Sequence, residues 1–353
     1  MRLKIVCDDK IPYIEPALHE LADEVVMKPG WDITADDVRE AHILVVRTRT
    51  RCDERLLAGS KVFLVVTATI GYDHLDTQWL GQHGIAWANC PGCNASSVGQ
   101  YVKCCLLQLK RQRGIDLRKY TLGIVGVGHV GSAVLEAMRP LGLKNVLLND
   151  PPRESAGETA PGGLGWSPLE HILAEADIIT FHTPLTQKAP YPTLHLANEV
   201  FFNVLRQRPG RVIINAARGG VVDEAALLNA MDEGIVREAI IDTWEGEPHI
   251  NRELLRRAFI ATPHIAGYSA DGKANATRKT LQHICTMLMR PMTFEVCPPA
   301  LPASFHPSPD EEELALQLYD PMADTLRLRT SPENFERLRG CYPLRREFVE
   351  MVK

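Results

Sequence analysis

Short apolar runs alternate with helical stretches over residues 1–90. The apolar runs have the length of buried strands, and segments 36–41 and 75–82 between them are helical in pattern. This alternation predicts an open α/β domain with a parallel sheet. The strands expected in this domain are Leu3–Cys7, Ile43–Arg47, Val62–Thr67 and Ile85–Ala88.

A second alternation begins at Tyr120 and predicts six more strands with helices between them. Six such strands are what a doubly wound dinucleotide-binding sheet, the Rossmann fold, requires. The helical segment 272–289 follows without a sheet of its own to cover, so we expect it to cross between domains together with a helix that starts at Ala95. The six strands are expected at Leu122–Val125, Val146–Asn149, Asp177–Phe181, Val212–Asn215, Ala239–Asp242 and Phe259–Ala261.

Three glycines, Gly126, Gly128 and Gly131, lie between the predicted strand 122–125 and a predicted helix at 132–141. In this position the first glycine allows a tight turn, and the second lets backbone N–H groups approach a pyrophosphate. The third lets the helix pack closely on the strand. The alternative is a glycine turn that binds nothing, but strand, helix and a downstream acid together favour a nucleotide site.

That acid is Asp150, which ends the next apolar run nineteen residues after Gly131. A carboxylate there accepts hydrogen bonds from an adenosine ribose and repels a 2′-phosphate, which favours NAD over NADP. Arg153 lies close by in the sequence and weakens this distinction, because an arginine can accommodate a 2′-phosphate.

Composition excludes several kinds of partner. A net charge of −5 and a pI near 6.2 provide no basic surface for nucleic acid or an anionic membrane, so the expected partner is a small molecule. The chain begins with a strand-like run instead of a signal peptide, and its longest apolar runs are far too short for a membrane span. These features predict a cytoplasmic protein.

The cysteines fit the same compartment. Nine of them, an odd number scattered along the chain, are typical of reduced thiols. Cys90 and Cys93 form the one CxxC motif, and without a second pair it is more simply a turn at a helix entry than a redox pair or half a zinc site. No residue pattern suggests a metal.

Candidate chemistry lies at strand ends of the second predicted domain, in Arg218, Glu247 and His264. A dehydrogenase acting on a hydroxyl carbon needs a base, and histidine suits this role because its pKa lies near working pH. A carboxylate orients such a base, and an arginine grips a substrate carboxylate through two parallel hydrogen bonds. Singly, each residue has a plainer interpretation as a solvated loop charge, an acid in a turn, or a strand-end histidine.

With the glycine loop and Phe181-His-Thr-Pro-Leu185, these three motifs resemble the D-2-hydroxyacid dehydrogenases over nearly the whole chain. The resemblance implies NAD-dependent oxidation of a 2-hydroxy acid to a 2-oxo acid. Within the family, the chain is most similar to enzymes of pyridoxal 5′-phosphate synthesis that act on a phosphorylated four-carbon acid. That closer similarity is carried by Thr67-Ala-Thr-Ile-Gly-Tyr-Asp-His74, Pro91-Gly-Cys-Asn94, Asp150-Pro-Pro-Arg153, Trp244-Glu-Gly-Glu-Pro248, His264-Ile-Ala-Gly-Tyr268 and Tyr342-Pro-Leu-Arg-Arg-Glu-Phe348.

The resemblance also implies a domain plan. We expect a discontinuous flavodoxin-like substrate-binding domain at 1–91 and 267–290 and a Rossmann NAD-binding domain at 92–266. Residues 291–309 contain six prolines and are expected to form a linker. Residues 310–353 resemble a small α+β dimerisation segment, shorter than the family's usual one, and imply a homodimer. Too short to bury much core alone, this segment should pack on the main body or on a second subunit.

The resemblance assigns roles to single residues. His264 would accept the proton, Glu247 would orient it, and Arg218 would hold the carboxylate and polarise the C2 oxygen. His182 is left out of the chemistry and is expected to shape the adenine-side loop. The implied substrate contacts are Thr48, Thr69 and Tyr268. The implied cofactor contacts are Gly126, Gly128, His129, Val130, Gly131, Asp150, Thr183, Ala216, Ala217, Arg218, Asp242 (to the nicotinamide carboxamide) and Gly267.

Arginines offer candidates for the phosphate end. In Arg47-Thr-Arg-Thr-Arg51 the three arginines would face one way if the segment is extended, and we hypothesise that Arg47 reaches the phosphate. The alternative is an edge strand guarded by exposed charge. Arg345 and Arg346 are expected at a solvated helix end, with contact to a neighbouring subunit's active site as the alternative.

Two other functions remain open from the sequence. One is a related dehydrogenase with a different acid, such as D-3-phosphoglycerate or an unphosphorylated D-2-hydroxy acid. The other is an NAD-sensing, corepressor-like binding protein with the same fold.

Overall fold

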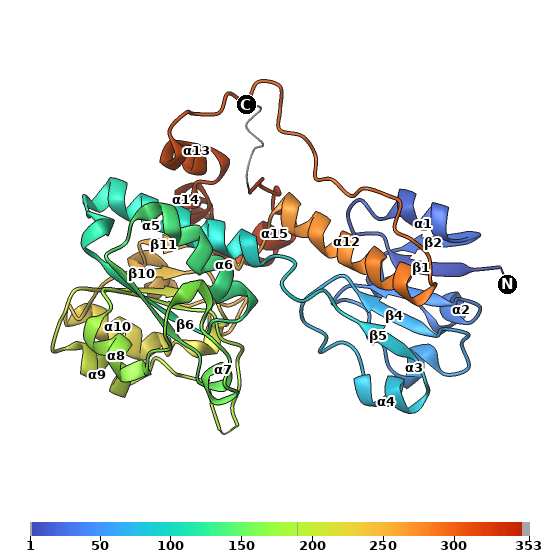
Figure 1. Ribbon diagram of the computed structural model, residues 1–353, viewed down its shortest axis with the longest axis horizontal. Helices are drawn as coiled ribbons and strands as arrows, with labels where there is room; N and C mark the ends of the chain where they lie inside the picture. Colours follow the sequence, from blue (N-terminus) through green and yellow to red (C-terminus); the bar gives the residue numbers. More distant parts are fainter. Residues whose placement is uncertain (1, 189, 348–353) are drawn as a thin grey trace. The chain divides into compact units, whose positions relative to one another are not determined.

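The computed structural model describes residues 2–188 and 190–347, and the chain divides into two compact units (Figure 1). The first unit takes residues 1–94 and 269–303, and the second takes residues 95–268 and 304–353. We expected these boundaries at 91/92 and 266/267. The proline-rich segment 291–309 lies largely in the first unit, which extends to residue 303.

A five-stranded parallel sheet forms the first unit, in the order β2-β1-β3-β4-β5. This is the flavodoxin-like order. The half-buried strand β2 was not predicted, because its Val25, Val26 and Met27 make only a short apolar run between charged residues. The strands are β1 (Lys4–Asp8), β2 (Glu24–Lys28), β3 (Ile43–Val46), β4 (Leu64–Thr67) and β5 (Ala86–Ala88).

Helices cover both faces of this sheet. The expectation that the helix near 272–289 has no sheet to cover was wrong: Ala274, Leu281 and Ile284 of α12 are buried in the core that α1 shares with β1, β3 and β4. In Figure 1 this helix (orange) runs along the strands of the unit. The helices of the unit are α1 (Glu15–Leu21), α2 (Ala35–Val38), α3 (Glu54–Leu57), α4 (Thr77–Gln82) and α12 (Ala270–Met287).

The CxxC motif packs against α12. Cys90 and Cys93 are buried free thiols, and Cys90 Sγ lies 3.3 Å from the carbonyl oxygen of Ala276. Burial raises the pKa of Cys93 to about 11, and burial likewise raises the pKa of Cys90. Such thiols are poor nucleophiles, which favours the interpretation of the motif as a packed turn over a redox pair.

The second unit is built on six parallel strands in the order β11-β10-β9-β8-β6-β7. All six were predicted, with ends shifted by a few residues. Since β6 lies between β7 and β8, the chain reverses direction across the sheet there, which is where ligands bind in such folds. The strands are β6 (Thr121–Val125), β7 (Asn145–Asn149), β8 (Ile178–Phe181), β9 (Arg211–Asn215), β10 (Val236–Ile241) and β11 (Ile260–Ala261).

Two apolar cores, one on each face, hold this sheet between helices. On one face lie α5 (Ala95–Arg113) and α6 (His129–Met138). On the other lie α8 (Leu169–Glu175), α9 (Glu199–Leu205), α10 (Glu224–Asp232) and α11 (Arg252–Arg257). The short helix α7 (Pro151–Ser155) follows β7. Among the described residues, no helix combines the length and apolar character needed to cross a membrane.

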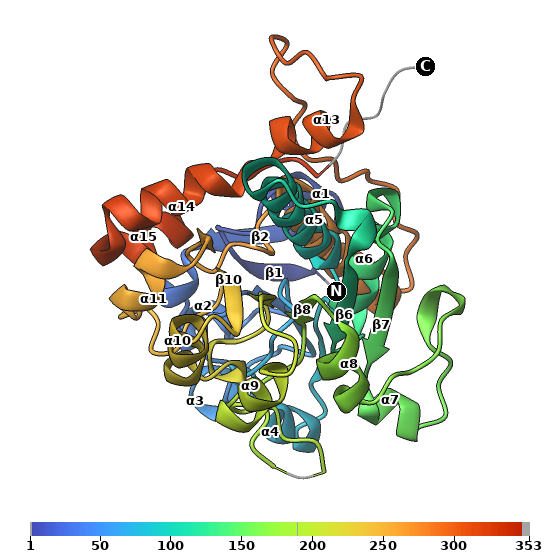
Figure 2. The same cartoon turned by 90° about the vertical axis from the view of Figure 1, so that its left-hand side faces the viewer.

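The C-terminal segment packs on the second unit. Its helices are α13 (Glu311–Leu318), α14 (Pro321–Thr330) and α15 (Phe335–Gly340), and the described residues add no strand to the sheets. Leu316 joins the core under α5, whereas Leu328 and Phe335 join the opposite core. Figure 2 shows α14 and α15 (red) beside α11, at the β11 edge of the sheet. Residues 348–353 of this predicted segment lie outside the described residues.

Short 3₁₀ helices connect these elements. They are η1 (Gly30–Asp32), η2 (Leu117–Lys119), η3 (Arg139–Leu141), η4 (Pro161–Gly163), η5 (Gly219–Val221) and η6 (Pro332–Asn334).

Candidate active site

The glycine loop joins β6 to α6. Gly126 has φ +86°, a left-handed conformation that a side chain disfavours. A Cβ on Gly131 would lie 2.1 Å from the carbonyl oxygen of Gly126, so only glycine lets helix and strand approach this closely. A Cβ on Gly128 would meet nothing within 4 Å, which leaves this face of the loop open.

Asp150 fixes the neighbouring turn. Its carboxylate accepts hydrogen bonds from the N–H groups of Val127, at 2.8 Å, and Arg153, at 3.2 Å. Arg153 itself pairs with Glu158 at 2.7 Å and donates to the Val127 carbonyl. With its guanidinium so engaged, Arg153 no longer argues for a 2′-phosphate.

A cavity of about 540 Å³ opens between the glycine loop, α7 and the loop after β8. Two polar atoms in its wall, Thr183 Oγ1 and His182 Nδ1, are buried without a hydrogen-bond partner among the described residues. Burial lowers the pKa of His182 to about 3, so its ring stays neutral. Apolar walls around a few unpaired polar atoms fit the adenosine half of NAD. The apolar part of the lining includes Pro151, Pro152, Leu169, Pro184, Pro192 and Leu196.

A hydrogen-bonded pair of side chains follows β10 and β11. His264 Nδ1 lies 2.8 Å from Glu247 Oε2, while the N–H of Trp244 donates to Glu247 Oε1 at 2.9 Å. The carboxylate therefore receives the Nδ1 proton and leaves Nε2 as the acceptor atom. His264 has φ +57°, a conformation that a non-glycine residue adopts only where its surroundings impose it.

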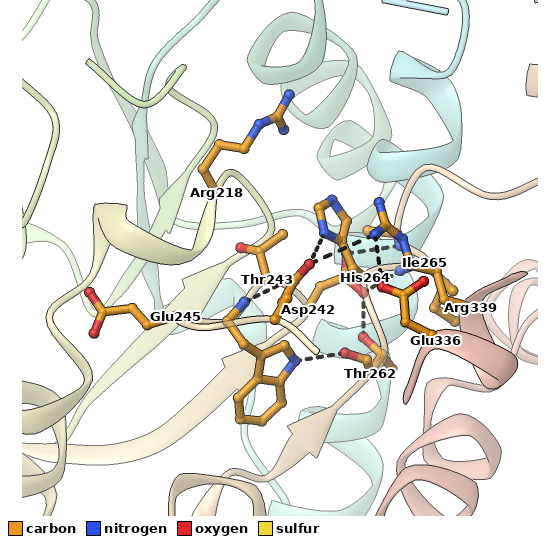
Figure 3. A network of polar contacts seen from close by, with 12 residues as sticks. Arg218, Asp242, Thr243, Glu245, Thr262, His264, Ile265, Glu336 and Arg339 are labelled. Carbon is orange, nitrogen blue, oxygen red and sulfur yellow. Dashed lines mark hydrogen bonds and ion pairs between the residues drawn. The ribbon is translucent and has the colours of Figure 1, made fainter. Parts of the chain in front are cut away.

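Asp242 imposes that backbone shape. Its buried carboxylate accepts from the N–H groups of Ile265, at 2.8 Å, and Ala266, at 3.0 Å, and from Thr262 Oγ1 at 2.6 Å. Burial raises the pKa of Asp242, although the charge of His264 and these hydrogen bonds oppose the rise. Trp244 Nε1 also donates to the Thr262 carbonyl, at 2.9 Å. The network in Figure 3 thus holds His264 from both sides.

Arg218 lies in the loop after β9. Its Nη1 donates to the Ala217 carbonyl at 2.8 Å, and it forms no ion pair within the described part of the chain. Figure 3 shows it apart from the dashed network, with its charge available to an anion. The next residue must be glycine, because a Cβ on Gly219 would lie 1.9 Å from the Trp244 carbonyl oxygen.

Two arginines of the C-terminal segment also reach this site, and the sequence did not point to them in this role. Arg345, expected at a solvated helix end, is 7% exposed and donates to the carbonyls of Ile265, Ala266 and Tyr268 at 3.1, 2.6 and 2.8 Å. That expectation was wrong, because these carbonyls replace water around the guanidinium. Arg339 Nη1 lies 3.9 Å from Glu247 Oε2.

Tyr268, an expected substrate contact, lies in this clamped loop. Its ring meets that of Tyr342 edge to face, with 6.3 Å between centroids. Gly267 and Tyr268 come soon after His264 in the same loop, so the contacts that hold this loop help to position all three residues.

The expected contacts of the first unit follow neighbouring strands. Thr48 is exposed in the turn after β3, and Thr69 Oγ1, after β4, donates to the Gly71 carbonyl at 2.8 Å. The segment from Arg47 to Arg51 is a turn, not an extended run, so its arginines do not share one face. Arg47 donates to the Lys10 carbonyl at 2.7 Å.

Comparison with known proteins finds similarity to the D-isomer-specific 2-hydroxyacid dehydrogenases. Residues 98–266 match the family model described as D-isomer specific 2-hydroxyacid dehydrogenase, NAD binding domain. The chain is 50% identical to the erythronate-4-phosphate dehydrogenase of Bacteroides thetaiotaomicron, over 98% of this chain and 97% of that protein. It is 40% identical to the Porphyromonas gingivalis enzyme of the same name, over 98% of this chain and 94% of that protein.

Solved structures show the same fold at lower identity. D-2-hydroxyisocaproate dehydrogenase superposes with a TM-score of 0.67 at 20% identity, over 81% of this chain and 97% of that one. A D-lactate dehydrogenase from Treponema pallidum superposes with a TM-score of 0.66 at 23% identity, over 82% of this chain and 98% of that one.

Proposed function

Since this chain belongs to the erythronate-4-phosphate dehydrogenases, within the D-isomer-specific 2-hydroxyacid dehydrogenase family, we propose that it oxidises 4-phospho-D-erythronate with NAD. The product is 2-oxo-3-hydroxy-4-phosphobutanoate, an intermediate of pyridoxal 5′-phosphate (vitamin B6) synthesis. The observation that carries the proposal is the Glu247–His264 pair at 2.8 Å, in a chain with an unpaired Arg218 at the end of a neighbouring strand.

His264 Nε2 takes the proton of the C2 hydroxyl, because its Nδ1–H is committed to Glu247. Glu247 holds the ring in that tautomer and stabilises the imidazolium that results. Arg218 binds the substrate carboxylate and polarises the C2 oxygen. When bound, NAD supplies the acceptor for the hydride that leaves C2.

The groups proposed to hold NAD lie after the six strands of the second unit. Gly126, Gly128 and Gly131 let the pyrophosphate approach the start of α6, together with His129 and Val130. Asp150 accepts from the ribose. The Asp242 carboxylate can accept about four hydrogen bonds and accepts three from the protein. One acceptor site is left for the nicotinamide carboxamide. Thr183, Ala216, Ala217, Arg218 and Gly267 complete the proposed set.

The first test is NADH formation with 4-phospho-D-erythronate, measured beside D-3-phosphoglycerate and an unphosphorylated D-2-hydroxy acid. A 2-oxo acid is added so that tightly held cofactor turns over. We expect turnover with the first acid and a loss of about 10²–10⁴-fold in kcat for His264→Asn, because the base is removed. The matched control is His171→Asn, an exposed histidine on α8 that should retain wild-type kcat.

Two results would overturn the proposal. Faster turnover of D-3-phosphoglycerate would indicate the related dehydrogenase. Measurable NAD binding with no turnover of any acid would indicate the NAD-sensing binding protein.

Further parts of the proposal concern the substrate and the assembly. Thr48, Thr69 and Tyr268 are proposed substrate contacts, and Arg47 is a candidate for the phosphate. We also propose a homodimer, which light scattering tests: a monomer at micromolar concentration would contradict it. Free thiols at all nine cysteines support a cytoplasmic location.

A further inference from the structure

Arg339 of α15 brings a cation to the Glu247–His264 pair. Its Nη1 lies 3.9 Å from Glu247 Oε2, the same oxygen that receives His264 Nδ1–H at 2.8 Å. Arg339 Nε is buried and has no hydrogen-bond partner among the described residues. Figure 3 shows the guanidinium beside His264, with Glu336 next to it.

The charged groups around the pair come from several elements. Besides Arg339, they are Arg218 after β9, Asp242 and Glu245 after β10, Glu224 at the start of α10, Glu336 on α15, and Arg345, which donates to the carbonyls of the loop after His264. Asp242 and Glu247 act directly on His264, and both are anionic when ionised. Glu336 lies 4.0 Å from Arg339 and is half exposed, so solvent screens its effect.

Anions next to an imidazole favour its protonated form. A protonated His264 has no lone pair on Nε2 and cannot take the hydroxyl proton, so the charges around the pair affect the pH range of oxidation. A guanidinium on the shared Glu247 oxygen opposes this effect, because it repels the imidazolium and offsets the carboxylate charge.

We propose that Arg339 is a positioning residue that acts on the Glu247–His264 pair through Oε2 of Glu247 and so extends the activity of the enzyme toward lower pH. The inference rests on the proposed function in that it takes His264 as the catalytic base. Through Arg339, the C-terminal segment sets the pH range in which the enzyme works.

The packing of α15 supports this role. Phe335 is fully buried in the core of the second unit, and Leu338 packs against that core. The helix backbone is thereby fixed, and the guanidinium lies near the carboxylates of Glu247 and Glu336. Burial alone would raise the pKa of Glu247, but the hydrogen bond and charge of His264, the Trp244 N–H and the charge of Arg339 together lower it.

The test is the pH profile of kcat/KM for 4-phospho-D-erythronate in Arg339→Gln. We expect the midpoint of the acid limb to rise by about one pH unit, which is a tenfold loss at pH values below it. The high-pH plateau and the KM for NAD should stay unchanged. Arg339→Lys should restore most of the wild-type midpoint. Arg337→Gln, an exposed arginine of the same helix, is the matched control and should leave the profile unchanged.

A second readout does not need turnover. The imidazole titration of His264, followed by NMR and assigned by its loss in His264→Asn, should move upward in Arg339→Gln by the same amount. An equal loss of kcat/KM at every pH, or a higher substrate KM with an unmoved midpoint, would overturn the proposal. If the wild-type protein fails to oxidise the acid, the proposed function falls, and the NMR titration still decides the role of Arg339.

Discussion

Single residues were predictable where a local motif carries the chemistry. The spacing of Gly126 and Gly131 predicted their roles. The structure explains why both must be glycine: Gly126 has a left-handed φ, and a Cβ on Gly131 would lie 2.1 Å from the Gly126 carbonyl oxygen. Residue type and position made Glu247 and His264 candidates, and the resemblance to the family implied their partnership. The burial of Arg345 was not predicted, because its partners are backbone carbonyls 77 to 248 residues away, and a sequence pattern does not show which carbonyls a side chain will meet.

Glu224, at the first position of α10, offers a residue-scale prediction about stability. The side chain is 6% exposed. Burial raises its pKa from 4.5 to about 7, and the nearby charges of Glu245 and Glu247 add to this rise. The hydrogen bonds that the carboxylate accepts oppose the rise. Between these two pH values the folded protein binds more protons than the unfolded chain. Its free energy of unfolding therefore falls as pH rises through this range.

Glu224→Gln removes that dependence. Relative to wild type, its free energy of unfolding should rise by about 2 kcal/mol between pH 5 and pH 8, as measured by urea denaturation. Glu199→Gln is the control, since this residue holds the same position at the start of α9 but is exposed. A difference between Glu224→Gln and wild type that does not change with pH would contradict the prediction.

Elements were predicted best where a buried apolar run is long. The strands at the centre of both sheets were found, whereas β2 was missed because an edge strand buries only part of its surface. For α12 the helix was predicted correctly and its packing was not, since the sheet that it covers is formed by residues 4–88, far earlier in the chain. Sequence-local patterns contain no information about such pairing.

Helix α14 packs against the edge strand β11, and a hydrogen bond between them can be tested. Thr325 Oγ1 accepts from the N–H of Ala261 at 3.0 Å and donates to the Pro321 carbonyl at 2.9 Å, so the edge strand has a partner where another strand would pair. Thr325→Val keeps the shape but leaves that buried N–H without an acceptor. We expect a loss of about 1–3 kcal/mol in the free energy of unfolding.

Urea unfolding measures this loss, with Thr325→Ser as the control that keeps the hydroxyl. The serine variant should lose less than about 1 kcal/mol. Equal losses in both variants would mean that the methyl group, not the hydrogen bond, carries the effect.

At the scale of the whole molecule, composition and alternation were enough to predict two α/β units, and the two sheet orders have the expected flavodoxin-like and doubly wound topologies. The fate of the C-terminal segment was not predictable beyond its need for a surface to cover. Its helices supply residues to both cores of the second unit.

The thiols provide a prediction for the whole chain. Of the nine cysteines, seven are buried and two, Cys297 and Cys341, are exposed. Ellman's reagent should titrate about two thiols quickly in the native protein and nine after denaturation in guanidinium, because buried thiols with raised pKa values react slowly. Fast reaction of Cys90 or Cys93 would contradict the packed-turn interpretation of the CxxC motif.

The contact of Arg345 with the loop that carries His264 affects when the active site can form during synthesis. The ribosome delivers the loop that carries His264 long before it delivers the arginine that binds the Ile265 carbonyl 80 residues later. A nascent chain can therefore assemble both sheets while its active-site loop still lacks the clamp. Catalytic competence should come only after Arg345 has been made and has bound this loop.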